Sequence, residues 1–184
     1  MHLFRNDYSE GAAPQILDAV CHVSAEQNVG YSEGDAHCDH ARELIRAACE
    51  CPDAMVEFCI GGTSANVICL NGMLRDWEGV ICTPDAHIIV HETGALGATG
   101  RTSLPTTDRD GFLSPEAAER VYQFQMGTGR HMTRPAAIYI TDTTELGGVW
   151  DRERLDAICD WARSHDLTLV AQLHACTAQD VIDA

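Results

Sequence analysis

Short apolar runs alternate with stretches of helical periodicity along this 184-residue chain, and this alternation constrains the fold more than any other feature. In the helical stretches apolar residues recur every three or four positions, whereas the strand-like runs are shorter and continuously apolar. Strands that alternate with helices in this way predict an α/β fold built on a mostly parallel sheet. The helical ranges are 35–50, 63–74, 88–96, 114–125 and 151–165, and the strand-like ranges are 54–60, 79–82, 136–141 and 167–171.

Net charge and the identity of the basic residues restrict the function. The chain has 28 acidic and 12 basic residues, a formal net charge of −16, which would repel nucleic-acid phosphates and anionic membranes. We therefore expect neither nucleic acid nor a membrane as a partner. All 12 basic residues are arginine, so the sequence offers no lysine amine for Schiff-base chemistry.

The nine cysteines predict a reducing compartment rather than a disulfide framework. Their number is odd, and most lie in apolar periodic stretches, where a thiol serves as a small hydrophobe. No signal-peptide pattern opens the sequence, and no apolar run is long enough to span a membrane. We expect a cytoplasmic protein in which the following cysteines are buried: Cys49, Cys59, Cys69, Cys82 and Cys159.

The stretch from Ile60 to Asn66 reads IGGTSAN, at the junction between a strand-like run and a helical one. Glycines at such a junction let a ligand approach the backbone, and the first N–H groups of a helix attract an anion, often a phosphate. The candidate anion-binding residues are Gly61, Gly62, Thr63 and Ser64. The alternative is a glycine-rich turn capped by Thr63 without a ligand, since neither a P-loop lysine nor a third glycine at dinucleotide spacing is present.

His87 lies in the stretch TPDAHIIVHETGA and is a second candidate site residue. A histidine between apolar residues is either a hydrogen-bonded core residue or a functional one, and the local pattern leaves both open. His91 and Glu92 follow it and could pair with each other.

A structural zinc site is not expected, because Cys49 and Cys51 lack the CxxC spacing that zinc sites favour. Three further residues of metal-binding type lie just before these cysteines, namely His37, Cys38 and His40. We predict no metal site among them.

Five stretches together resemble one family of enzymes. They are FRNDYSEG (4–11), EQNVGY (26–31), CIGGTSAN (59–66), HIIVHETGALGATG (87–100) and TELGGVW (144–150). In this order and spacing they resemble the threonine aldolase and aromatic amino acid β-eliminating lyase family, which uses pyridoxal phosphate and has the aspartate aminotransferase fold (fold type I). The resemblance runs from about Phe4 to about Val170. It implies a three-layer α/β/α arrangement in which residues 1–184 form part of the large domain, without the small C-terminal domain.

The resemblance implies roles for the matching positions. Gly61, Gly62, Thr63 and Ser64 would hold the cofactor phosphate at a helix N-terminus, in agreement with the anion site inferred from the residues themselves. His87 would stack on the pyridine ring. The residues that would approach the amino-acid substrate are Asn6 and Asp7.

The C-terminal part of the sequence departs from the family pattern. Family members carry an Asp-Gly-Ala-Arg strand end, whose Asp pairs with the ring nitrogen and whose Arg receives the substrate carboxylate. Here residues 167–175 read LTLVAQLHA. Either Gln172 stands in place of the Asp, or residues 171–173 align with Ala-Arg-Leu after a short deletion. In both alignments the Asp and the Arg are missing. The Gly-Gly-Thr-Lys stretch that holds the Schiff-base lysine is also missing, and no catalytic residue is assigned.

The implied reaction is cleavage of a β-hydroxy-α-amino acid, such as L-threonine to glycine and acetaldehyde, with β-elimination as its close neighbour. We expect this chain to hold pyridoxal phosphate non-covalently at best and to be inactive alone. Two alternatives stay open. One is a non-catalytic subunit that docks on a full-length paralogue or within a homo-oligomer, and the other is a decayed or truncated gene product.

Overall fold

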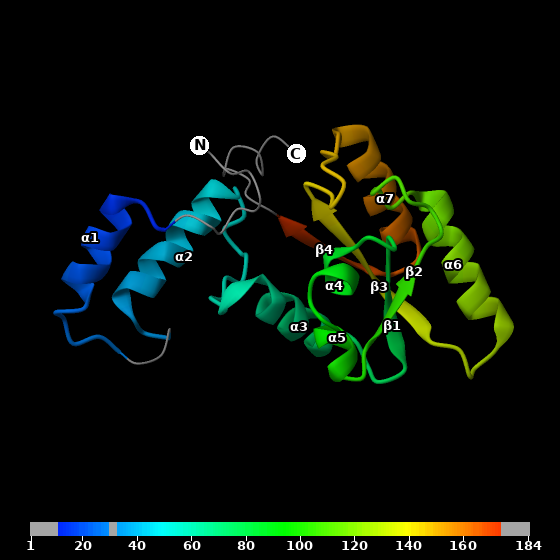
Figure 1. Ribbon diagram of the computed structural model, residues 1–184, viewed down its shortest axis with the longest axis horizontal. Helices are drawn as coiled ribbons and strands as arrows, with labels where there is room; N and C mark the ends of the chain where they lie inside the picture. Colours follow the sequence, from blue (N-terminus) through cyan, green and yellow to red (C-terminus); the bar gives the residue numbers. More distant parts are fainter. Residues whose placement is uncertain (1–10, 30–32, 174–184) are drawn as a thin grey trace. The chain divides into compact units, whose positions relative to one another are not determined.

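The computed structural model describes residues 11–29 and 33–173 (Figure 1). These residues form two compact units, one up to Phe58 and the other from Cys59 onward. Helices make up the regular structure of the first, and a parallel sheet between helices makes up the second. No helix in these ranges is both long and apolar enough to cross a membrane.

Helix α2 (Ala36–Ala48) organises the first unit, which also contains helix α1 (Pro14–Val23). The Asp35 carboxylate accepts hydrogen bonds from the backbone N–H groups of His37 and Cys38, which satisfies two donors at the start of α2. The helix predicted over 35–50 is therefore confirmed, whereas α1 was not predicted.

The strand predicted over residues 54–60 is wrong, because none of these residues is in a strand. Their carbonyl groups accept hydrogen bonds from arginine side chains of α2 instead of from a neighbouring strand. Arg46 Nε donates to the Ala54 carbonyl at 2.8 Å, and Arg42 Nε donates to the Val56 carbonyl at 3.1 Å. An apolar run thus needs a neighbouring strand to become one, and no described residue supplies it here.

Four parallel strands form the sheet of the second unit, in the order β2-β1-β3-β4 (Figure 1). Ile81 of β1 pairs with Leu104 of β2 on one side and with Ile138 of β3 on the other. The sequence predicts β1, β3 and β4 but not β2, since a four-residue strand with one buried side chain has almost no periodic signal. The strands are β1 (Glu78–Cys82), β2 (Thr102–Pro105), β3 (Arg134–Asp142) and β4 (Thr168–Leu173).

Side chains of the central strands alternate between the two faces of this sheet. On one face Ile81, Ile138 and Ile140 pack against α6 and α7. On the other face Val80 and Tyr139 pack against α3, α4 and α5. The predicted three-layer α/β/α arrangement is therefore confirmed (Figure 1). These helices are α3 (Gly61–Met73), α4 (His87–Val90), α5 (Ala95–Ala98), α6 (Pro115–Thr128) and α7 (Arg152–Ser164).

Predicted helices are confirmed where a polar residue caps their start. Ser114 Oγ accepts from the Ala117 N–H at 3.1 Å before α6, and the Asp151 carboxylate accepts from the Arg154 N–H at 2.8 Å before α7. The helix predicted over 88–96 is instead split into α4 and α5. Gly94 adopts a left-handed φ of 77° between them, which interrupts the helical backbone.

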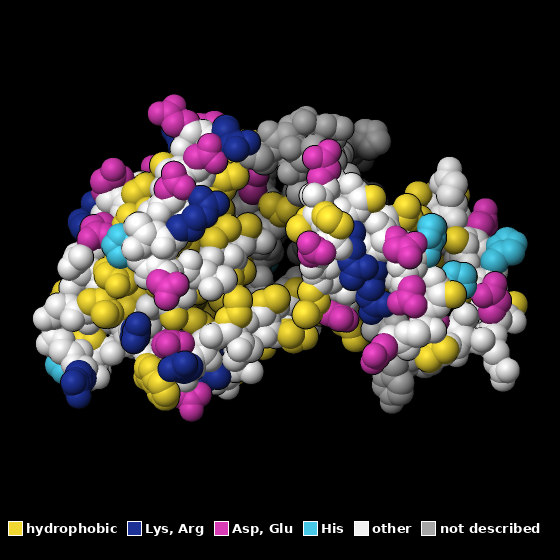
Figure 2. All heavy atoms as spheres, turned by 180° about the vertical axis from the view of Figure 1, so that it is seen from behind, with side chains coloured by type: hydrophobic (Ala, Val, Ile, Leu, Met, Phe, Trp, Pro, Cys, Tyr) yellow, Lys and Arg dark blue, Asp and Glu magenta, His cyan; other side chains and the backbone are white. Residues whose placement is uncertain are grey.

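The prediction that the cysteines are buried is wrong for three of the five named. Cys82 is buried in β1 and Cys159 is partly buried, but Cys49, Cys59 and Cys69 are exposed. Larger apolar side chains are also exposed, and Figure 2 shows hydrophobic atoms at the surface of the sheet unit. Apolar neighbours in sequence therefore do not bury a side chain, because burial depends on the side of the element that meets a packing partner.

Candidate functional site

Three neighbouring strands direct polar side chains to the same edge of the sheet. His87 follows β1, Glu145 follows β3, and Gln172 is the penultimate residue of β4. These strands are parallel and adjacent, so their carboxyl ends lie along one edge. Ligands of open α/β sheets bind at this edge, which makes it the candidate site.

Helix α3 begins at Gly61 without a capping side chain. Its N-cap residue, Ile60, contributes no side-chain hydrogen bond, and no acidic residue lies in its first turn. Gly62, Thr63 and Ser64 follow within the helix, so the alternative in which Thr63 caps the turn is wrong. The positive end of a 13-residue helix is thus available to an anion.

Gly62 lies close to the end of β4. A Cβ atom built on Gly62 would be 3.8 Å from Nε2 of Gln172. The first turn of α3, with the predicted anion-binding residues, therefore lies beside the candidate edge of the sheet.

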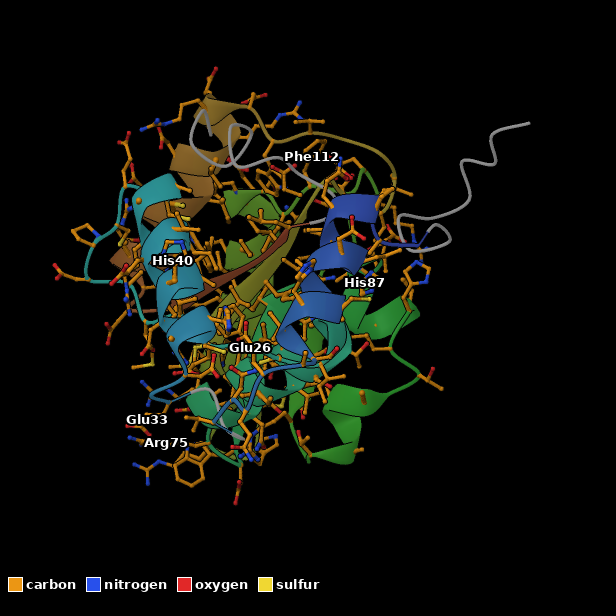
Figure 3. All side chains as sticks on the ribbon, turned by 90° about the vertical axis from the view of Figure 1, so that its left-hand side faces the viewer. Glu26, Glu33, His40, Arg75, His87 and Phe112 are labelled. Atoms are coloured by element: carbon orange, nitrogen blue, oxygen red, sulfur yellow. The ribbon has the colours of Figure 1, made fainter. Side chains whose placement is uncertain are left out.

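Glu145 contacts two histidines at this edge. Nδ1 of His87 donates to Oε1 of Glu145 at 2.8 Å, and Nε2 of His91 lies 3.1 Å from Oε2 of the same carboxylate. The two imidazole centroids are 5.0 Å apart. The suggested pairing of His91 with Glu92 is therefore wrong. Figure 3 labels His87, whose side chain is 24% exposed, so its ring is held at one edge and partly open to a ligand.

A buried polar network connects α3, β3, β4 and the segment after α4. Nδ2 of Asn66 donates to Oε1 of Glu92 at 2.6 Å and also to Oε1 of Gln172, while the Tyr139 hydroxyl donates to the same Gln172 oxygen. Asn66, Glu92 and Tyr139 are each at most 6% exposed. Burial, and then the negative charge of Glu92, raises the pKa of Tyr139 above its usual range. The Tyr139 hydroxyl is therefore a proton donor in this network.

Glu92 determines how both amides are oriented. A carboxylate only accepts hydrogen bonds, so the Asn66 atom that faces Glu92 is the NH2 group. That NH2 group also donates to Gln172, whose amide oxygen must then face Asn66. The Gln172 NH2 group is left on the side of Gly62. The second Glu92 oxygen, Oε2, is buried without a hydrogen-bond partner among the described residues.

Sequence reasoning did not single out Asn66, Glu145 or Tyr139 as site residues. Asn66 and Glu145 stand in two stretches that carry the family resemblance, IGGTSAN and TELGGVW, and this was the available signal. Tyr139 lies in a buried strand and gave no such signal, because its hydroxyl contacts are made with residues distant in sequence.

The remaining predicted residues lie either outside the described part of the chain or in the other unit. The two proposed substrate contacts, Asn6 and Asp7, lie outside the described residues. In the other unit, His37 pairs with Glu26 at 3.0 Å rather than with a cysteine. Within residues 11–29 and 33–173, no metal-type cluster joins the histidines and cysteines between His37 and Cys51.

Comparison with known proteins gives a matching family and two curated relatives. Residues 4–172 match the family described as "Beta-eliminating lyase". A low specificity L-threonine aldolase from Pseudomonas sp. (strain NCIMB 10558) is 28% identical over 90% of this chain and 47% of its own length. A low specificity L-threonine aldolase from Pseudomonas aeruginosa is 26% identical over 84% of this chain and 44% of its own length. The chain thus spans about half the length of the curated relatives it matches.

Solved structures agree with this fold. Threonine aldolase from Leishmania major superposes with a TM-score of 0.86 at 38% identity, covering 90% of this chain and 48% of that one. N-Succinyldiaminopimelate aminotransferase from Mycobacterium tuberculosis superposes with a TM-score of 0.61 at 18% identity, covering 89% of this chain and 42% of that one. The second likeness concerns the fold alone.

Proposed function

This chain belongs to the β-eliminating lyase family, and on that premise we propose that it forms the pyridoxal-phosphate-binding part of a lyase of the threonine aldolase type. The supporting observation is the uncapped start of α3 beside the sheet edge that carries His87, Glu145 and Gln172. The reaction proposed for the complete enzyme is cleavage of a β-hydroxy-α-amino acid, such as L-threonine to glycine and acetaldehyde. The same proposal includes two further points. Residues 1–184 form one partial large domain, and the protein is located in the cytoplasm.

The residues at the sheet edge suit this cofactor. Backbone N–H groups from Gly61 to Ser64, with the hydroxyls of Thr63 and Ser64, would bind the phosphate. His87, which Glu145 holds through Nδ1, would stack on the pyridine ring. When bound, pyridoxal phosphate supplies an electron sink for a substrate carbanion.

Gln172 changes what the site offers to the pyridine nitrogen. If it replaces the aspartate of the family pattern, its NH2 group, oriented through Asn66 and Glu92, presents a donor where the family presents an acceptor. A donor favours the unprotonated form of the ring nitrogen and so weakens the electron sink. We therefore expect this substitution to make carbanion-forming chemistry on the cofactor less efficient.

The sequence contains no lysine, so none of its side chains can form the usual Schiff base. We infer that the chain binds the cofactor non-covalently and that, by itself, it does not cleave L-threonine. A non-catalytic subunit, working within a homo-oligomer or beside a full-length paralogue, and a decayed or truncated product remain the alternative functions. Co-purification of a lysine-bearing partner would favour the subunit.

The binding proposal is tested by titrating the purified protein with pyridoxal phosphate and with pyridoxal, which lacks the phosphate. We expect saturable binding of pyridoxal phosphate, weaker binding of pyridoxal, and competition by inorganic phosphate. The Ile60→Asp variant should bind pyridoxal phosphate at least about tenfold more weakly, since its carboxylate would occupy the N–H groups and repel the phosphate. Helix α3 should keep its stability, because aspartate is a favourable N-cap residue.

Ile60→Leu is the matched control and should keep the affinity of the unmodified protein, because Ile60 makes no side-chain hydrogen bond. Equal binding of pyridoxal and pyridoxal phosphate, or unchanged binding by Ile60→Asp, would refute the phosphate site. After borohydride treatment, mass spectrometry should find no cofactor attached to a side chain. A side-chain adduct would contradict the non-covalent mode.

A further inference from the structure

We propose that His87, His91 and Glu145 form a binding site for a divalent transition-metal cation such as Zn²⁺. One ligand atom from each residue, two imidazole nitrogens and a carboxylate oxygen, lies within 4.8 Å of the other two. Among the described residues this is the only such group of histidine, cysteine and acidic side chains. The proposal goes beyond the cofactor function and does not depend on it.

The two histidines have the spacing of helical zinc ligands. His87 is the first residue of α4 and His91 is its C-cap, so they stand four residues apart and project from the same side of the helix. Histidines at positions i and i+4 are the arrangement with which helical motifs bind zinc. Glu145 reaches them from the loop after β3 and completes a His2Glu set, one of the ligand sets of catalytic zinc sites.

The distances fit a tetrahedral ion after a small adjustment. Metal–ligand bonds of about 2.0–2.1 Å place neighbouring ligand atoms roughly 3.3 Å apart. The His87 Nδ1 to Glu145 Oε1 distance is 2.8 Å, and the His91 Nε2 to Glu145 Oε2 distance is 3.1 Å. These two distances end on different oxygens of Glu145, and the three ligand atoms lie within 4.8 Å of one another, so the side chains must adjust before all three meet one ion.

The donor atoms select the class of cation. Two imidazole nitrogens favour Zn²⁺, Co²⁺ or Ni²⁺ over Mg²⁺ and Ca²⁺, which prefer oxygen ligands. Three protein ligands leave a coordination position for a water molecule or a substrate hydroxyl. The ion would bind a ring nitrogen of His87, whereas stacking uses the face of the ring.

Exposure of the three side chains suits a site that an ion can enter from solvent. The His91 side chain is 55% exposed, whereas the Glu145 side chain is only 16% exposed. The exposed imidazole offers the ion a path to the site, and the sheltered carboxylate supplies a negative charge that water screens less. Without an ion, the same carboxylate pairs with both imidazoles.

The test is a titration of the full chain with Co²⁺, followed by absorbance and isothermal calorimetry, with Zn²⁺ used for displacement. We expect one ion per chain and a visible ligand-field spectrum without thiolate charge-transfer absorption. His91→Ala and Glu145→Gln should each weaken binding at least about tenfold, and circular dichroism should show that both variants are folded. His40→Ala, which changes an exposed histidine of α2 labelled in Figure 3, should bind like the unmodified chain.

Some outcomes would overturn the proposal. Equal affinity in His91→Ala and the unmodified chain would exclude His91 as a ligand. Binding that disappears after alkylation of the cysteines, or that persists in Glu145→Gln but is lost in His40→Ala, would place the ion elsewhere. Failure to bind Co²⁺ or Zn²⁺ at all would refute the site, whereas the cofactor titration would be unaffected by that result.

Discussion

Replacing Gly79 by alanine should destabilise the sheet unit by about 3 kcal/mol. Gly79 pairs with Thr102 in the ladder between β1 and β2. A Cβ atom at this position would lie 2.7 Å from the backbone oxygen of Thr102, 2.8 Å from Cγ2 of Thr133 and 3.1 Å from Cδ1 of Leu104. The first two distances are shorter than normal packing permits, so one of the strands has to move.

The size of the destabilisation depends on which atoms around Gly79 can move. Inserting a methylene or methyl group into a packed core costs about 1–3 kcal/mol when side chains can adjust. Here the closest atom belongs to the backbone of β2, and shifting it also weakens a ladder hydrogen bond worth about 1 kcal/mol. The sum lies near the upper end of that range. We expect urea unfolding, followed by tryptophan fluorescence, to show the loss as a lower midpoint with an unchanged slope.

Gly127→Ala is the matched control. Gly127 lies in helix α6, and a Cβ atom there would meet nothing within 4 Å. Alanine is the better helix former, so this variant should be more stable by about 0.5 kcal/mol. If Gly79→Ala unfolds within about 0.5 kcal/mol of the unmodified protein, or if the two variants shift in the same direction, the close approach of β1 and β2 is refuted.

Two further predictions concern titrating groups. Burial raises the pKa of the Cys82 thiol to about 12. Brief iodoacetamide treatment of the native protein should therefore leave Cys82 unmodified while the exposed Cys51 reacts. Peptide mass spectrometry measures both modifications, and modification of Cys82 before Cys51 would contradict the prediction. Hydrogen bonds from Gln123 and then Trp161 lower the pKa of Glu119 in the folded protein. The ionised Glu119 side chain therefore stabilises the fold at pH values above its pKa in the unfolded chain. This stabilisation is lost as the pH falls through its pKa in the folded protein. The difference in urea midpoint between the unmodified chain and Glu119→Gln should therefore shrink from about pH 7 to about pH 3, and a constant difference would exclude this role.

Sequence patterns between near neighbours predicted those helices and strands that depend on interactions between near neighbours. Apolar residues at helical spacing predicted α6 and α7, and the structure adds the caps Ser114 and Asp151, each of which acts on N–H groups only a few residues away. The central strands β1 and β3 were predicted because both of their faces are covered and their sequences are continuously apolar. Residues 54–60 have a similar composition, but among the described residues none pairs with them as a strand, and their backbone accepts hydrogen bonds from arginine side chains.

Periodicity and motifs were enough to predict the α/β layers and the candidates Gly61 to Ser64 and His87, and the composition contains no lysine. The three-dimensional contacts were needed to show which carboxylate His87 and His91 contact and how the Gln172 amide is oriented. The two kinds of feature differ in the range of the interactions behind them. Periodicity and capping act between near neighbours in the chain, whereas the pairs His87–Glu145 and Asn66–Gln172 join residues that only the parallel order of the strands brings to one edge.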